Sequence, residues 1–241
     1  MTIANYCCAS APFAAWLVSG CAVQMFLPPT GISALVETPT TVGEGAHAVR
    51  GSVGGIGRLL GAAVRSGSIT YTRGLSETSE ITVGPVVQNY GKGGESIDGF
   101  EPSHAFGYGA DVRYKARPFG TEHVAVYAGG GGTYNRYAAF VTAQVGASVG
   151  YANAYVVPFF DVHAYGAEPL ASTDFVFRGD KSAPGKVLHP SRTGGLLASG
   201  GLCANLPGGI EVAASVNVGG VLSETDKATV GGFVLGAGYK F

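Results

Sequence analysis

Apolar and polar residues alternate along most of the chain after about residue 45, and a period of two is the pattern of β-strands with unlike faces. Four segments show the alternation without interruption: 105–116, 141–151, 210–219 and 233–241. In the last of them, Phe233, Leu235 and Tyr239 share one face, while Gly236 and Gly238 lie on the other. The pattern predicts an all-β protein.

The second face of these strands is unlike a surface that meets bulk water. It consists mostly of Gly, Ala and Ser with a few charges, whereas the exposed face of a soluble sandwich is normally rich in Lys, Glu and Thr. Small residues suit a narrow enclosed interior, and the apolar face then turns toward lipid. Only a closed barrel leaves no unpaired backbone groups in hydrocarbon. We therefore expect a closed antiparallel up-and-down transmembrane β-barrel.

The alternation gives about ten strands, with eight as the alternative. The expected segments are 45–54, 58–73, 78–88, 105–116, 121–131, 134–151, 153–166, 193–205, 209–219 and 229–241. Every second connection is short (75–78, 118–121, 152–153 and 207–208), and the two longest, 89–104 and 167–192, fall at the other end. Short turns at one end and long loops at the other are the layout of bacterial outer-membrane barrels.

Composition narrows the classes further. Of 241 residues, 40 are Gly, and each Gly inside a helix costs roughly 0.8–1 kcal/mol relative to Ala, which disfavours a helical protein. An apolar content of 46% disfavours disorder. The net charge of −1 offers no basic surface for phosphate groups, so we expect no nucleic-acid partner.

The amino-terminal stretch carries no charged side chain before Glu37. Its apolar core ends in Leu17-Val18-Ser19-Gly20-Cys21, which resembles the lipobox of bacterial lipoproteins. The resemblance implies that Cys21 is the lipid-attachment residue and the mature amino terminus. It divides the chain into a signal peptide (1–20), a tether (21–44) that contains Pro28-Pro29, and an outer-membrane barrel (45–241).

Two other interpretations of the amino-terminal stretch remain. An ordinary secretory signal is also apolar, and an uncleaved helix over 3–27 would anchor the chain, although Pro12 would break its hydrogen-bond ladder. All three send the chain out of the cytoplasm. Cys7, Cys8 and Cys21 lie at or before the proposed cleavage point, so Cys203 alone would remain as a thiol and no internal disulfide is expected.

The ending Tyr239-Lys240-Phe241 resembles the carboxy-terminal β-signal of outer-membrane proteins. In that family the barrel-assembly machinery recognises the terminal strand, so the resemblance implies this partner and a bacterial outer-membrane location. Residues 109–115 are also similar to small outer-membrane barrel proteins.

Several charged residues fall on the inward parity: Glu80, Asp111, Arg113, Lys115, Asp161, His163, Glu211 and Lys240. They could form the charged constriction of a pore, but paired charges that fill a narrow interior are the simpler interpretation. Asp161 and His163 share a strand face, and such a pair could act as a general base in a hydrolase. The other histidines have no metal-ligand spacing, and the run Gly129–Gly132 lacks the Lys of a phosphate-binding loop, so no metal or cofactor is expected.

These features favour a non-enzymatic outer-membrane barrel, lipid-anchored at Cys21, with a structural or surface-interaction role. A narrow passive channel for small solutes is the second hypothesis, and a membrane-embedded hydrolase that uses Asp161 and His163 is the third.

Overall fold

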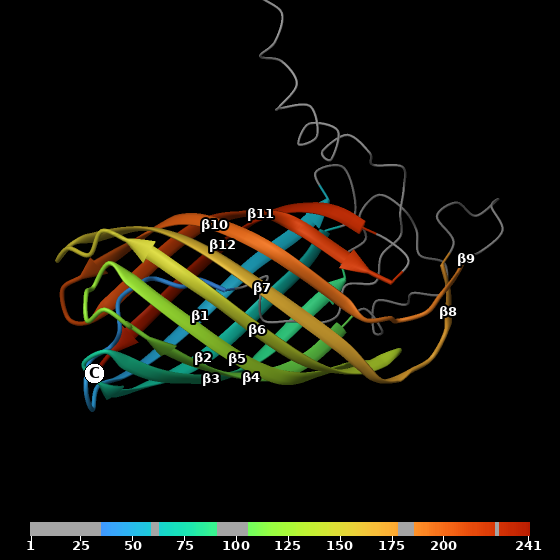
Figure 1. The fold of residues 1–241 in the computed structure, drawn as a ribbon, viewed down its shortest axis with the longest axis horizontal. Coiled ribbons are helices and arrows are strands. Elements are labelled where there is room, and N and C mark those ends of the chain that lie inside the picture. Colours follow the sequence, from blue (N-terminus) through green and yellow to red (C-terminus); the bar gives the residue numbers. More distant parts are fainter. Residues whose placement is uncertain (1–34, 59–62, 91–105, 178–185, 225–226) are drawn as a thin grey trace, which may run out of the picture.

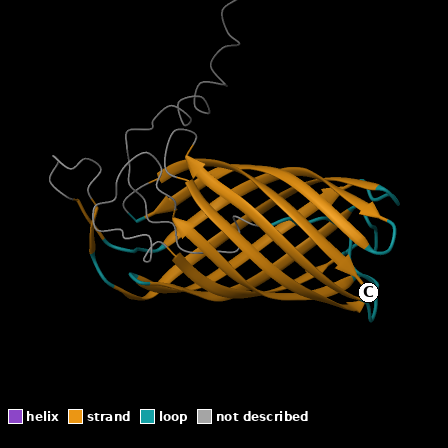
Figure 2. Cartoon of the chain, turned by 180° about the vertical axis from the view of Figure 1, so that it is seen from behind, coloured by secondary structure: helices purple, strands orange, loops and turns teal. Residues whose placement is uncertain are grey.

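The computed structural model describes residues 35–58, 63–90, 106–177, 186–224 and 227–241. Ten antiparallel strands form a closed barrel, and a short two-stranded hairpin lies outside it (Figures 1 and 2). The barrel strands are β1 (His47–Arg58), β2 (Ala63–Ser76), β3 (Ser79–Tyr90), β4 (Phe106–Ala116), β5 (Val124–Asn135), β6 (Ala138–Gly150), β7 (Val156–Ser172), β10 (Thr193–Leu206), β11 (Ile210–Ser223) and β12 (Lys227–Lys240). The hairpin pairs β8 (Phe175–Phe177) with β9 (Lys186–Leu188).

Each barrel strand pairs with its neighbours in sequence, and β1 pairs with β12 to close the sheet. Closure confirms the predicted up-and-down barrel and its strand number. Within the described residues, no helix has the length and apolar character needed to cross a membrane.

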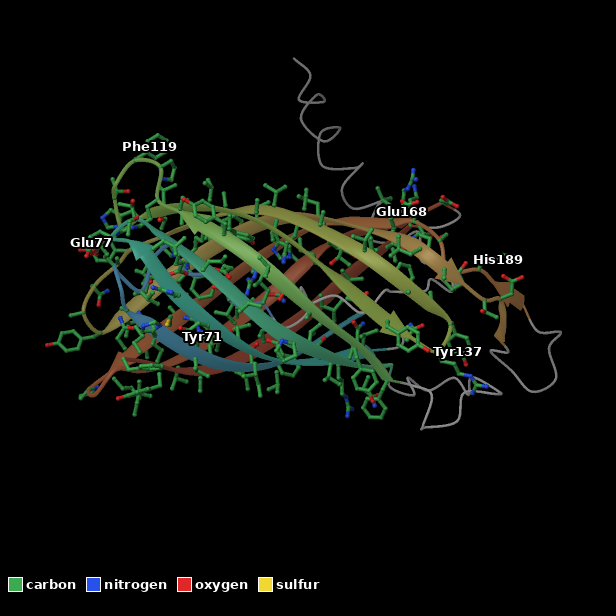
Figure 3. All side chains as sticks on the ribbon, turned by 90° about the horizontal axis from the view of Figure 1, so that it is seen from below. Tyr71, Glu77, Phe119, Tyr137, Glu168 and His189 are labelled. Atoms are coloured by element: carbon green, nitrogen blue, oxygen red, sulfur yellow. The ribbon has the colours of Figure 1, made fainter. Side chains whose placement is uncertain are left out.

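The connections differ between the two ends of the barrel. Residues 77–78, 117–123, 151–155 and 207–209 make short turns at the end where the chain terminates, here called the turn end. The opposite end, here called the loop end, carries the β8–β9 hairpin. Figure 3 shows Glu77 and Phe119 at the turn end and Glu168 and His189 at the loop end.

The predicted strand parities are confirmed in all four strongly alternating segments. In β11, for example, burial alternates residue by residue, with Val212 and Val216 outside and Glu211 and Ser215 inside. The exterior therefore presents an apolar belt, which contains Val53, Ile69, Val145, Leu202, Val216 and Leu235. Exposed aromatic side chains lie near both ends: Tyr71, Tyr114, Tyr151, Tyr155, Tyr239 and Phe241 at the turn end, and Phe106, Tyr108 and Tyr134 at the loop end.

Several expected strand ends were wrong. The sixth strand begins at Ala138 instead of 134, and the seventh ends at Ser172 instead of 166. The first strand continues to Arg58 instead of stopping near residue 54. The fifth strand passes through Gly129–Gly132 to Asn135, although the glycine run was expected to contain its end. Glycine is required there by space rather than by a turn, since a Cβ on Gly129 would lie 2.4 Å from Cγ of Arg113 on β4.

The apolar belt makes a testable prediction at Val216, which is 67% exposed and lies at the middle of β11. We expect Val216→Arg to destabilise the barrel in lipid vesicles by about 2–4 kcal/mol, because a charge near the bilayer midplane is poorly solvated. Urea unfolding measures the change, with Val216→Leu as the matched control. Equal stability of the two variants would mean that this face does not contact lipid.

Candidate functional site: the barrel interior

Residues 35–46, here called the inner segment, fold back into the barrel ahead of β1 (Figure 2). The reversal occurs at Gly43 and Gly45, whose φ angles of 93° and 72° are favourable only for glycine. Hydrogen bonds from Gly45 N to Gly74 O (3.2 Å) and from Gly74 N to Ala46 O (2.9 Å) hold the turn against β2. Of the expected tether (21–44), residues 35–39 are buried inside the barrel, residues 40–43 are partly exposed, and Glu44 is exposed at the mouth of the barrel.

Glu37 joins the inner segment to the barrel wall. Its carboxylate accepts hydrogen bonds from Arg113 Nη1 and, at 3.3 Å, from Lys115 Nζ on β4. Lys115 also pairs with Glu80 Oε1 at 2.6 Å, and the other oxygen of Glu80 accepts the backbone N–H of Val42 at 2.8 Å. All four charged side chains are buried. Each carboxylate therefore neutralises a wall cation and fixes the inner segment.

A second ion-pair group lies on the adjoining wall of the barrel. Glu211 pairs with Arg50 Nη2 at 2.8 Å and with Lys240 Nζ at 2.5 Å, so a single carboxylate links β1, β11 and β12 near the seam. Arg50 also donates from Nη1 to the carbonyl oxygen of Val36 at 3.3 Å. The inner segment is thus bound to both groups of charges.

Apolar contacts close the space around the end of the inner segment. Val36 packs in a buried cluster with Val157, Phe159, Cys203, Ala213 and Val234. Toward the loop end a second cluster of Ile56, Leu197, Val221 and Val230, with Tyr165 against it, also points inward. The interior therefore holds packed side chains at two levels, in addition to the charged layer at the turn end.

Asp161 and His163 are brought together as predicted, and the structure adds Tyr127. His163 Nδ1 lies 2.8 Å from Asp161 Oδ2, and the Tyr127 hydroxyl donates to the same carboxylate at 2.9 and 3.1 Å. Among the described residues, His163 Nε2 has no hydrogen-bond partner. A histidine oriented by a carboxylate can act as a general base. All three side chains are buried, however, and a buried histidine is poorly placed to meet a substrate.

Gly146 makes room for this group. A Cβ at Gly146 would lie 2.4 Å from Cζ and the hydroxyl oxygen of Tyr127 and 2.8 Å from Cβ of His163. We expect Gly146→Ala to destabilise the barrel by about 1–3 kcal/mol, the usual cost of overpacking a filled interior. Gly166→Ala is the matched control, because nothing lies within 4 Å of its Cβ position. Urea unfolding should separate the two variants, and equal stability would show that the Tyr127 ring moves aside freely.

The eight charges predicted for the interior all lie on the inward side of their strands: Glu80, Asp111, Arg113, Lys115, Asp161, His163, Glu211 and Lys240. The paired-network interpretation of these residues is confirmed for the ion pairs described above. Glu37, Arg50 and Tyr127 were missed, although Glu37 is the first charge of the chain. Cys21 lies outside the described residues, as does His104, one of the histidines without metal-ligand spacing. The part of the chain that is described contains no cluster of three His, Cys, Asp or Glu suited to a metal.

The comparisons with known proteins found similarity in three-dimensional structure only. No protein-family model and no curated protein matches the sequence. Outer membrane protein OprG from Pseudomonas aeruginosa shares 10% identity, with a TM-score of 0.36 over 85% of this chain and 99% of that one. Ail, the attachment invasion locus protein of Yersinia pestis, shares 15% identity, with a TM-score of 0.35 over 82% and 99%. Outer membrane protease OmpT from Escherichia coli shares 9%, with a TM-score of 0.34 over 81% and 96%.

The cellular location follows from the chain's own exterior. An even number of antiparallel strands, an apolar belt with aromatic residues near both ends, and short turns at one end characterise bacterial outer-membrane barrels. Closure leaves no unpaired strand edge for lipid to meet. This chain is a β-barrel protein of the bacterial outer membrane.

Proposed function

We propose that the protein is a lipid-anchored, non-enzymatic outer-membrane barrel with a structural or surface-interaction role. The observation that carries the proposal is the occupied interior. The inner segment is held there by Glu37, which binds Arg113 and Lys115, and by Val36 in an apolar cluster. A filled barrel of this size is a membrane scaffold rather than a route for solutes.

The loop end supports a contact role. The β8–β9 hairpin extends beyond the barrel between β7 and β10 (Figure 1). At its base Arg192 pairs with Glu168, and His189 Nδ1 lies 2.5 Å from Asp174. These side chains are exposed, so the hairpin offers a surface of charged groups outside the apolar belt. Exposed loops on a rigid scaffold are the usual place for binding functions.

Planar-bilayer recording tests the proposed role against the channel hypothesis. We expect the wild-type barrel to insert without producing stable conductance steps, because the inner segment and two apolar clusters fill the interior. A porin measured in the same bilayers is the positive control. Steady ion conductance by the wild type would overturn the proposal and favour the passive channel.

Lipid attachment at Cys21 is part of the proposal. Cys21 precedes Leu35 by 14 residues, which can span up to about 50 Å when extended, so a lipid on Cys21 can reach a membrane surface from the barrel interior. Metabolically supplied palmitate should label the wild type and leave Cys21→Ala unlabelled. Equal labelling of both proteins would contradict lipid attachment at Cys21 and leave an ordinary secretory signal as the alternative.

One observation supports the hydrolase hypothesis: His163 lies beside Asp161, and its Nε2 has no hydrogen-bond partner in the described part of the chain. Burial of both residues disfavours it. A hydrolytic activity of the purified barrel that is lost in His163→Ala would contradict the proposed non-enzymatic role.

A further inference from the structure

We propose that the inner wall that holds residues 35–42 is a peptide-binding site, specific for an extended segment in which an apolar residue precedes a carboxylate. The chain's own inner segment fills the site in cis, and a peptide of the same chemistry can occupy it when that segment is out. The proposal rests on the proposed function, since it takes the occupied interior as its starting point.

The wall recognises the backbone of the inner segment. Arg50 and Lys115 donate to the carbonyl oxygens of Val36 and Thr38, each at 3.3 Å. Glu80 accepts the N–H of Val42 at 2.8 Å. Backbone contacts of this kind hold any extended peptide, as they do when peptides bind to folded domains.

Two side-chain contacts supply specificity. Val36 enters the buried cluster formed by Val157, Phe159, Cys203, Ala213 and Val234. The carboxylate of Glu37 bridges Arg113 and Lys115. An apolar pocket beside a pair of cations therefore selects an apolar residue followed by an acidic one.

The charges of the wall also favour an anion in the site, beside Arg113. Among the described wall residues in ion pairs here, the cations are Arg50, Arg113, Lys115 and Lys240, whereas the carboxylates are Glu80, Asp111, Glu211 and Asp161, the last beside His163. Arg113 is the least compensated cation, because Asp111 is 3.7 Å from its Nε. Without Glu37, the carboxylate that remains beside Arg113 among the described residues is Asp111 at 3.7 Å, so an acidic ligand is favoured at this position.

The inner segment can be exchanged because it is not part of the sheet. The ten strands close with β1 beginning at His47, so no ladder hydrogen bond depends on residues 35–42. The covalent connection of the segment to β1 runs through the turn at Gly43 and Gly45, and its other link to β1 among the described contacts is the hydrogen bond from Arg50 to Val36.

The test uses the full-length protein in detergent and a fluorescent peptide with the sequence of residues 35–43. In Glu37→Lys, repulsion from Arg113 and Lys115 should free the site. The Kd of the peptide, measured by fluorescence anisotropy, should therefore be at least tenfold lower for Glu37→Lys than for the wild type. A peptide with Gln in place of Glu should bind to the same variant at least tenfold more weakly than the Glu peptide. If Glu37→Lys does not fold, Glu37→Gln provides the test, because it removes the charge and keeps the shape.

A folded variant that binds the peptide no better than the wild type would overturn the proposal, as would equal binding of the Glu and Gln peptides. Failure of the proposed function is a separate result, since it appears as ion conductance by the wild type. If the wild type conducts no ions and the variant gains no peptide binding, the peptide-binding site is refuted and the proposed function still stands.

Discussion

Deletion of Phe241 should remove most of the assembled barrel from the outer membrane and leave unfolded chain in the periplasm, where it is degraded. In a soluble domain the last residue is usually frayed and its loss costs little. Here Phe241 and His47 exchange two backbone hydrogen bonds of 2.9 Å at the seam between β12 and β1. The Phe241 ring also stacks on His47 and Tyr239, at centroid distances of 5.7 and 5.9 Å.

A cold-versus-boiled gel measures the effect, because folded barrels resist detergent and migrate differently until they are heated. Phe119→Ala is the matched control, since Phe119 is an exposed ring in the turn between β4 and β5. We also propose that the barrel-assembly machinery recognises this terminal strand. A deletion mutant that accumulates normally with its heat-dependent shift would contradict both roles of Phe241.

Glu37→Ala should lower the free energy of unfolding by about 3 kcal/mol, near the lower end of the cost of breaking a buried ion pair. Arg113 would lose its nearest carboxylate, whereas Lys115 would keep Glu80. Water that enters the vacated interior would rehydrate both cations and limit the loss.

Urea unfolding in lipid vesicles measures this change, and Glu44→Ala provides the control on the same segment, because Glu44 is exposed at the mouth of the barrel. Equal stability of the two variants would mean that Glu37 contributes nothing to holding the inner segment.

The sequence was sufficient for the barrel because its alternation records which face each residue takes. Val145, Val216 and Phe233 were assigned outward from parity alone, and all three are exposed. Strand ends were harder to predict. Glycine marks both turns and close approaches of the backbone, and Gly129, Gly130 and Gly131 belong to the second kind.

The occupied interior could not be read from the pattern. A segment that runs inside a barrel needs no alternation, and residues 35–44 have the Pro, Thr and Gly content of an ordinary tether. The single signal was Glu37, an isolated carboxylate at the end of a stretch without charge. Its partners lie 76 and 78 residues further along the chain, so only the tertiary structure could identify them.

The group around Asp161 and His163 could likewise be predicted only in part. Two residues on one strand face are neighbours by geometry, so their contact was predictable. Tyr127 joins them from β5, two strands away, and its place depends on the registers of β5 with β6 and of β6 with β7. Sequence alternation fixes the face of a residue but not the register of its strand.

The most direct test of the occupied interior is a cross-link between the inner segment and the wall. In Val36→Cys, a short bifunctional thiol reagent should join the new cysteine to Cys203, its neighbour in the buried cluster, and mass spectrometry of the folded protein should recover the linked peptides. Glu44→Cys, at the mouth of the barrel, should give no link to Cys203. Efficient linkage of Val36→Cys would support an inner segment inside the barrel, whereas no linkage in a folded, heat-modifiable barrel would contradict it.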